Sequence, residues 1–168
     1  YNRTAAKARQ WTETYPGTMD GRIASAVSNA DIVITCVGAD PDLRALFLGE
    51  DGIIANAPEG ALLLDHTTAS ATVTRELAEY ACSRNQHWVD APVSGGQQGA
   101  EKGQLTIMCG GERTSYERAR PVMDCYGKVS HYMGPVGSGQ LTKMVNQITV
   151  AGLLEGLAEG IHFAEQAG

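Results

Sequence analysis

Three side chains that could handle a proton and a small polar molecule lie close together near the end of the sequence. Lys143, Asn146 and Gln147 are spaced i, i+3 and i+4, so on a helix they share one face. An apolar surrounding would lower the pKa of the lysine and allow proton exchange near neutral pH. Spacing alone favours a simpler interpretation, in which the lysine reaches solvent from an ordinary amphipathic helix. The neighbours that suggest such an apolar surrounding are Leu141, Met144, Val145 and Ile148.

A glycine-rich stretch offers a second kind of chemistry. Residues 90–111 read DAPVSGGQQGAEKGQLTIMCGG, and Ser94, Gly95 and Gly96 follow a strand-like segment within it. At the carboxyl edge of a sheet, adjacent backbone N–H groups without a Cβ in the way can surround an anion such as a small carboxylate. Residues 99–103 would then turn the chain back into the next strand. The alternative is a glycine-rich reverse turn that binds nothing.

Two segments bear on nucleotide binding. Gly137-Ser-Gly139 resembles the start of a dinucleotide fingerprint, but Thr142 stands where the third glycine belongs and no acidic residue follows at the expected distance. We therefore exclude it as a pyrophosphate loop. At the N-terminus, Asn2-Arg3-Thr4 supplies donors and a positive charge, which suit the 2′-phosphate of NADP better than the ribose hydroxyls of NAD. NADP is the predicted cofactor, with NAD as the alternative.

Short apolar runs alternate with helical segments along most of the chain. Buried, mostly parallel strands are predicted at residues 31–37, 61–65, 87–90 and 105–109. Helices are predicted at residues 4–11, 22–29, 41–48, 73–84 and 115–125. This alternation is typical of an α/β fold with a doubly wound sheet, whose ligands bind beyond the carboxyl ends of the strands.

The last part of the chain has a different pattern. After a further strand-like run at residues 128–133, an unbroken helical pattern extends to Gly168, which would cap it in a left-handed conformation. A helix of about 30 residues is too long for a crossover in a small sheet. We expect residues 1–134 to form one domain and residues 135–168 a long interdomain helix that begins a second, all-α domain. A stripe formed by Gly152, Gly156 and Gly160 predicts close packing against another backbone, or alternatively a bent helix.

Composition narrows the class of protein. The net charge is −6 and no run of Lys or Arg occurs, so a nucleic-acid partner is not expected. No apolar run reaches the roughly 20 residues that span a bilayer, and the N-terminus lacks a signal-peptide pattern, so we expect a soluble, cytoplasmic protein. The cysteines have neither zinc-ligand nor disulfide spacing, so no metal is expected, and they are interpreted as buried thiols: Cys36, Cys82, Cys109 and Cys125.

Several of these segments resemble the β-hydroxyacid dehydrogenase family, which includes 3-hydroxyisobutyrate dehydrogenase, tartronate semialdehyde reductase and glyoxylate/succinic semialdehyde reductase. YNRT is similar to its cofactor-selecting turn, DIVITCVGAD to the strand and loop under the dinucleotide, and DHTT to the segment beside the nicotinamide ribose. DAPVSGGQQGAEKGQLTIMCGG is similar to its substrate signature, and GPVGSGQLTKMVNQ to its catalytic helix motif. The resemblance covers nearly the whole chain.

The resemblance implies a fold and a set of roles. The fold would be a Rossmann-like doubly wound sheet that lacks its first βα unit, because the glycine-rich turn that precedes YNRT in the family is absent here. Lys143 would be the catalytic acid/base. The residues expected to bind substrate are Ser94, Gly95, Gly96, Asn146 and Gln147. The residues expected to bind cofactor are Asn2, Arg3, Thr4, Val37, Gly38, Thr67 and Thr68.

The implied activity is hydride transfer between a nicotinamide cofactor and a small 3-hydroxy acid or semialdehyde, in a protein that forms homo-oligomers through a C-terminal domain. Many family members have Asn four residues after the lysine, whereas here Gln147 has that position and Asn146 is one residue earlier. One alternative is a decarboxylating enzyme like 6-phosphogluconate dehydrogenase, although nothing basic for a sugar phosphate is near Ser94 or Lys143. A second is a non-catalytic dinucleotide-binding scaffold.

Overall fold

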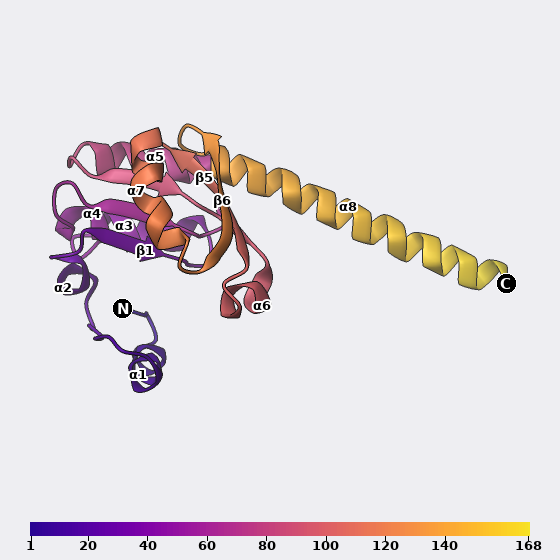
Figure 1. The fold of residues 1–168 in the computed structure, drawn as a ribbon, viewed down its shortest axis with the longest axis horizontal. Coiled ribbons are helices and arrows are strands. Elements are labelled where there is room, and N and C mark those ends of the chain that lie inside the picture. Colours follow the sequence, from indigo (N-terminus) through magenta and orange to yellow (C-terminus); the bar gives the residue numbers. More distant parts are fainter.

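The computed structural model describes residues 1–168, which form one mixed α/β body with a long helix projecting from it (Figure 1). The strands are β1 Ile32–Thr35, β2 Leu62–Asp65, β3 His87–Asp90, β4 Val93–Ser94, β5 Leu105–Gly111 and β6 Gly127–Gly134. The helices are α1 Ala5–Thr14, α2 Ile23–Val27, α3 Asp40–Leu48, α4 Ile53–Asn56, α5 Ala71–Cys82, α6 Gly96–Glu101, α7 Arg113–Met123 and α8 Ser138–Ala167. The Rossmann-like α/β fold is confirmed.

The six strands form one sheet in the order β1-β2-β3-β5-β4, and β6 pairs with β5. The pairs β1–β2, β2–β3 and β5–β6 are parallel, as predicted. β5 is the exception, because it runs antiparallel to both β3 and β4. A parallel return needs a crossover of a dozen or more residues, usually a long helix. The segment between β3 and β5 contains only β4 and the six-residue α6, so the chain turns back in the opposite direction.

Helices cover both faces of the sheet, and β2 shows why. All four of its residues are buried, and successive side chains point to opposite faces. Leu63 packs in the apolar cluster that includes α3 and α5 residues, whereas Leu62 and Leu64 belong to the cluster that includes α7 residues. A strand buried on both sides reads as a continuous apolar run, which is how this one was predicted.

The five predicted helices before residue 134 are confirmed with shifted boundaries. Ser70 begins α5 two or three residues earlier than the apolar pattern indicates, because its Oγ accepts a hydrogen bond from Val73 N at 3.0 Å. The short helices α4 and α6 were not predicted, since four and six residues are too few to show a helical period.

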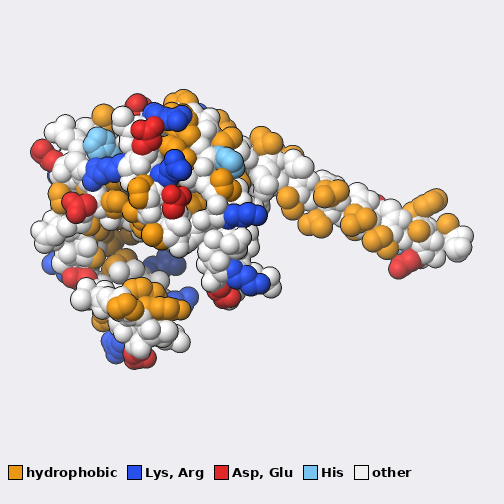
Figure 2. All heavy atoms as spheres, in the orientation of Figure 1, with side chains coloured by type: hydrophobic (Ala, Val, Ile, Leu, Met, Phe, Trp, Pro, Cys, Tyr) orange, Lys and Arg blue, Asp and Glu red, His pale blue; other side chains and the backbone are white.

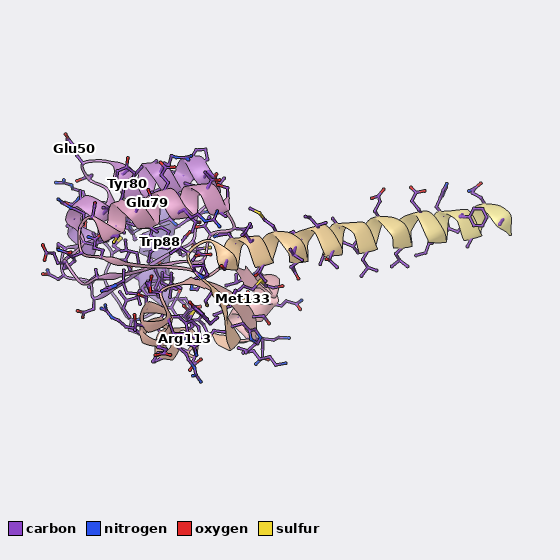
Figure 3. The ribbon with its side chains drawn as sticks, turned by 90° about the horizontal axis from the view of Figure 1, so that it is seen from above. Glu50, Glu79, Tyr80, Trp88, Arg113 and Met133 are labelled. Atoms are coloured by element: carbon purple, nitrogen blue, oxygen red, sulfur yellow. The ribbon has the colours of Figure 1, made fainter.

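Helix α8 is the predicted long helix and spans 30 residues. Only Gly139, Gln140 and Lys143 are buried, all near its beginning, and the rest extends away from the body without another element beside it (Figures 1 and 3). At its far end Gly168 has the expected left-handed conformation, with φ 87°. None of the helices, α8 included, combines the length and apolar content needed to cross a bilayer. Nothing lies within 4 Å of Gly152, Gly156 or Gly160 where a Cβ would be added.

The prediction of four buried thiols is wrong for three of them. Cys36, Cys82 and Cys125 are exposed, and only Cys109 is buried. Cys36 directly follows β1, and Cys82 and Cys125 lie at or just beyond the ends of helices. Residues at element ends leave the core even when the element itself is buried, which explains the error.

Candidate functional site

The N-terminal segment and the outer side of β1 enclose a cavity of about 620 Å³. In Figure 2 it appears as a hollow between the lobe that contains α1 and the body of the domain. Five of the seven predicted cofactor residues line it: Asn2, Arg3, Thr4, Val37 and Gly38. The fold therefore brings together two of the predicted cofactor segments, which are more than 30 residues apart in the chain.

Two basic side chains face this cavity. Arg3 is exposed, and its Nη1 lies 3.2 Å from Asp42 Oδ1 at the start of α3. Lys7, four residues later and on the first turn of α1, also lines the cavity and was missed by the sequence analysis. The i, i+4 spacing of two basic residues across the predicted helix start was the signal that could have found it. An anionic ligand would meet both charges together.

The remaining two predicted cofactor residues, Thr67 and Thr68, are placed differently. Thr68 is exposed, whereas Thr67 is fully buried in the loop after β2. The Thr67 hydroxyl donates to Asp65 Oδ1 at 2.7 Å and accepts a hydrogen bond from Val37 N at 3.0 Å. Thr67 thus holds the backbone of Val37, in the loop after β1, by a hydrogen bond. In this arrangement Thr67 would not contact a ligand itself but would position Val37, which would.

Two carboxylates end neighbouring parallel strands and are completely buried. Asp65 at the end of β2 is in register with Asp90 at the end of β3. Desolvation raises the pKa of each to about 6. Three hydrogen bonds reach Asp65 Oδ1, from Thr35 Oγ1, Thr67 N and Thr67 Oγ1, whereas its Oδ2 has no partner. Sequence analysis quoted both residues without assigning them a role.

Asp90 fixes the beginning of α8. Its Oδ1 accepts a hydrogen bond from Gly137 N at 2.7 Å, and its Oδ2 accepts one from Gln140 N at 3.0 Å. A negative charge at this end of a helix also complements the helix dipole. The backbones are in close contact, because a Cβ added to Gly110 of β5 would lie 2.8 Å from the amides of Ser138 and Gly139. The root of the long helix is therefore held tightly to the edge of the sheet.

Lys143 lies one turn beyond this root on the buried face of α8. It is only 9% exposed, and desolvation lowers the pKa of its ammonium group. The lysine is therefore buried rather than reaching solvent, as the spacing alone had favoured, and the apolar neighbours on α8 are not the cause. Leu141, Val145 and Ile148 are 46%, 65% and 73% exposed, so they do not surround the lysine. Instead the first turns of α8 pack against α5 and the strands β5 and β6.

The two amides predicted to orient a substrate are more accessible. Asn146 is half-buried and Gln147 is exposed, and Asn146 Nδ2 donates to Gln147 Oε1 at 3.1 Å. Both lie on the turn that follows Lys143, where α8 begins to leave the body of the domain.

The glycine cradle lies between β4 and α6. Ser94 is half-buried and ends β4, and Gly95 and Gly96 are exposed with φ of 133° and 60°. These values are in the region that favours glycine, so the turn depends on the missing side chains. Nothing lies within 4 Å of the position that a Gly96 Cβ would occupy, which leaves the backbone open on that side.

Strand β5 connects the cradle to the root of α8. Ser94 pairs with Thr106 of β5, and a Cβ on Gly139 would collide with the carbonyl oxygen of Met108. At about 3.4 Å per residue, the two contacts are roughly 7 Å apart along the strand. The cradle and the helix that bears Lys143 therefore lie at the same edge of the sheet. The cavity beside Arg3 lies at the opposite end of the strand order, next to β1.

The fold is that of a dinucleotide-binding domain, and comparisons with known proteins agree. A family model described as the NAD binding domain of 6-phosphogluconate dehydrogenase matches residues 1–134. An uncharacterized oxidoreductase of Shewanella frigidimarina is 54% identical over 168 residues, covering 100% of this chain and 58% of that protein. A probable 3-hydroxyisobutyrate dehydrogenase-like protein of Arabidopsis thaliana is 37% identical over 169 residues, covering 100% of this chain and 50% of its own length.

A solved structure gives the same result. Mycobacterium tuberculosis 3-hydroxyisobutyrate dehydrogenase, determined with L-serine, superposes with a TM-score of 0.91 at 31% identity, over 98% of this chain and 56% of the other. The chain belongs to the family of NAD-binding domains of 6-phosphogluconate dehydrogenase type and, within it, to the β-hydroxyacid dehydrogenases. It spans about half to three-fifths of the length of these relatives.

Proposed function

We propose that the full-length protein is an NAD(P)-dependent dehydrogenase or reductase that acts on a small 3-hydroxy acid or the corresponding semialdehyde. The observation that supports this most directly is the nearly complete burial of Lys143 at the root of α8, at the sheet edge that also bears the glycine cradle. A lysine with a lowered pKa in this position is suited to proton transfer.

Each part of the edge has a role in this proposal. Lys143 Nζ accepts the hydroxyl proton during oxidation, or donates a proton to the carbonyl oxygen during reduction. Ser94, Gly95 and Gly96 bind the substrate carboxylate through backbone N–H groups and the serine hydroxyl. Asn146 and Gln147 orient the substrate beside the lysine. A bound nicotinamide would supply or accept the hydride.

The cofactor would bind in the cavity beside β1. A volume of about 620 Å³ is adequate for a large part of a nucleotide, and most of the lining residues are apolar, with two basic side chains among the others. Arg3 and Lys7 would meet a 2′-phosphate, with Asn2 and Thr4 beside them. Val37 and Gly38 would lie under the dinucleotide, and Thr68 near the nicotinamide ribose. This arrangement favours NADP, and NAD remains the second candidate.

The test of the reaction is a substitution at the lysine in the full-length protein. Lys143→Ala is expected to lower turnover by about 10²- to 10⁴-fold, because the proton-transfer group is lost. The dissociation constant of NADPH, measured by fluorescence titration, should change little. Suitable trial substrates are 3-hydroxyisobutyrate, L-serine, glyoxylate, tartronate semialdehyde and succinic semialdehyde.

Lys128→Ala removes an exposed lysine of β6 and serves as the matched control, with turnover unchanged. Wild-type turnover in Lys143→Ala would contradict the assignment. Cofactor binding by the wild-type protein without turnover of any trial substrate would instead favour the non-catalytic dinucleotide-binding scaffold.

The cofactor preference is tested at Arg3. Arg3→Ala should weaken NADPH binding by about 10- to 100-fold, since a charge-assisted hydrogen bond to the phosphate contributes about 1.5–3 kcal/mol, and should leave NADH binding within about twofold. Arg9→Ala, on the exposed side of the same α1 helix, is the control. An equal loss of affinity for both cofactors would show that Arg3 does not contact the 2′-phosphate.

We also propose that α8 begins a second, helical domain and that the protein forms homo-oligomers through it. The apolar residues that α8 exposes support this, because a stripe of that size needs a packing partner (Figure 2). They include Leu153, Leu154, Leu157, Ile161 and Phe163.

A further inference from the structure

Gln140 is a buried residue of α8 to which the proposed reaction assigns no role. Its side chain is fully buried, which is unusual for an amide without a functional or structural partner. The Nε2 atom donates to the carbonyl oxygen of Thr67 at 2.7 Å, and the Oε1 atom accepts from the amide of Ala69 at 3.0 Å. We call these two hydrogen bonds the Gln140 clamp. They join the root of α8 to the loop after β2.

In one direction the clamp leads toward the proposed cofactor cavity. Thr67, whose carbonyl it holds, accepts a hydrogen bond at its hydroxyl from Val37 N, at 3.0 Å. Val37 lines the cavity beside β1. A shift of the loop after β2 would therefore move the backbone of Val37 as well, because a single buried side chain connects the two loops.

In the other direction the clamp leads to the proposed acid/base. Gln140 and Lys143 are three residues apart and lie on the same buried face of α8. The main chain of Gln140 is itself fixed, since its N–H donates to Asp90 Oδ2 at 3.0 Å. Between the clamp and the lysine there is less than one turn of rigid helix, so the position of Lys143 Nζ follows the position of the clamp.

Resting on the proposed function, we propose that Gln140 is a positioning residue that couples the cofactor loop at Thr67 and Val37 to the catalytic lysine. Its amide sets where the first turn of α8 lies relative to the bound cofactor. Misplacement of a catalytic group by about 1 Å can lower a rate by about 100-fold. Loss of the clamp should therefore affect the chemical step more than the binding of either ligand.

The chain contains a matched control for a buried amide. Gln86 is 5% exposed, and its Nε2 donates to the carbonyl oxygens of Ile54 and Ala57 at 3.1 and 2.8 Å. It joins the start of β3 to α4 and contacts no residue of the proposed site. Substitution at Gln86 also removes a buried side-chain amide, one whose Nε2 makes two hydrogen bonds and whose Oε1 has no partner, so it reports what a merely structural role would do.

Two substitutions at each position test the proposal in the full-length protein. Gln140→Leu removes both hydrogen bonds. Gln140→Glu preserves the size of the side chain and the acceptor for Ala69 N, but it can donate to the Thr67 carbonyl only when the introduced carboxyl is protonated. Gln86→Leu and Gln86→Glu are the controls.

The first readout is kcat and KM in the reductive direction, where a protonated lysine is the active form. Both are expressed as the ratio of variant to wild type at each pH.

The second readout needs no substrate. The pH dependence of labelling of Lys143 by an amine reagent, followed by mass spectrometry, gives the apparent pKa of this lysine in each variant. Four groups near the clamp have shifted pKa values and titrate in every variant: Asp65, His66, Asp90 and Lys143. Because all variants share them, comparison with the wild type removes their contribution to the pH dependence.

The expected result has three parts. Gln140→Leu lowers kcat by about 10- to 100-fold with KM and the NADPH dissociation constant within about threefold, and the Lys143 pKa rises toward its ordinary value. Gln140→Glu shows a similar loss at high pH and recovers toward wild-type kcat as the pH falls. The Gln86 variants lower the melting temperature but change neither kcat nor the Lys143 pKa.

Equal kcat losses at Gln140 and Gln86, or an unchanged Lys143 pKa in both Gln140 variants, would overturn the proposal. A different result would be expected if Lys143 were not the acid/base of the proposed reaction. Lys143→Ala would then retain turnover, and the labelling experiment would still decide whether Gln140 positions the lysine. Should Gln140→Leu fail to fold, Gln140→Glu decides by its pH dependence.

Discussion

The unpaired oxygen of Asp65 is the clearest sign of strain in the site at the residue scale. The carboxyl group is completely buried, and its Oδ2 has no hydrogen-bond partner even though Oδ1 has three. Asp90 is its register partner on the adjacent strand, and the charge of Asp90 adds to the desolvation that raises the pKa of Asp65. At neutral pH the domain therefore carries two ionised groups in a place that favours the protonated form.

This arrangement predicts a pH-dependent stability. A carboxyl group with a folded-state pKa of about 6, above the ordinary value of 3.8, takes up its proton more readily in the folded protein. Its favourable contribution is present at low pH and is lost as the pH rises through about 6. Asp65→Asn mimics the protonated form, so it should reduce the fall in unfolding free energy between about pH 4 and pH 7 by on the order of 1–3 kcal/mol.

Urea unfolding of the full-length protein at several pH values measures this difference. Asp31→Asn changes an exposed aspartate and is the control. An identical pH dependence in wild type and Asp65→Asn would mean that the carboxylate is solvated in the protein, for example by a buried water beside Oδ2.

At the scale of elements, the contact between β5 and α8 depends on the absence of side chains. A Cβ on Gly139 would collide with the carbonyl oxygen of Met108 and would also lie 2.7 Å from that of Asp90. Backbone atoms cannot move aside as a flexible side chain would. Close approach is what allows Asp90 to reach the first amides of the helix.

Gly139→Ala should therefore destabilise the domain by about 1–3 kcal/mol and lower turnover, because the root of α8 must move away from the sheet. Gly152→Ala makes the same change further along α8, where nothing lies within 4 Å of the added Cβ. In residues 1–168 it should stabilise α8 by up to about 1 kcal/mol. Thermal unfolding monitored by circular dichroism checks both. Similar effects of the two substitutions would refute the packing argument.

Elements with a strong local pattern could be predicted from the sequence. The apolar runs of β1, β2 and β3 and the long uninterrupted pattern of α8 indicated the elements themselves. The antiparallel direction of β5 could not be predicted, because it follows from the shortness of the connection through α6, and a six-residue helix has no detectable period. Strand direction depends on how a whole connection folds, which no residue type specifies.

The site shows the same limit. The glycines of the cradle and the lysine were predicted as site residues because their residue types are unusual for their positions. The sequence pattern assigned no role to Gln140, which lies one turn before Lys143. Its role depends on two backbone atoms more than 70 residues away, and a hydrogen bond to a main-chain group leaves no mark on the residue that provides it.

At the largest scale described by residues 1–168, β1 is the last strand at one end of the sheet and α8 extends from the body without another element beside it. β1 ends the strand order, its outer side faces the cavity, and Ile34 is 48% exposed. α8 leaves the body near Met133, on the side away from α1 (Figures 1 and 3). The proposed cofactor cavity and the proposed acid/base are therefore at different margins of one sheet, and the loops after β1 and β2 connect them.

The length of α8 turns small rotations at its root into large translations at its tip. At about 1.5 Å per residue the helix is about 45 Å long, so a tilt of about 5° at the first turn displaces the far end by about 4 Å. The pivot of this lever is the group of hydrogen bonds that Asp90 and Gln140 make. Sub-ångström shifts of the loop that holds Gln140 would therefore become displacements of several ångströms for any structure attached to the last turns of α8. The rigidity of these hydrogen bonds determines how precisely such a structure is oriented relative to the sheet.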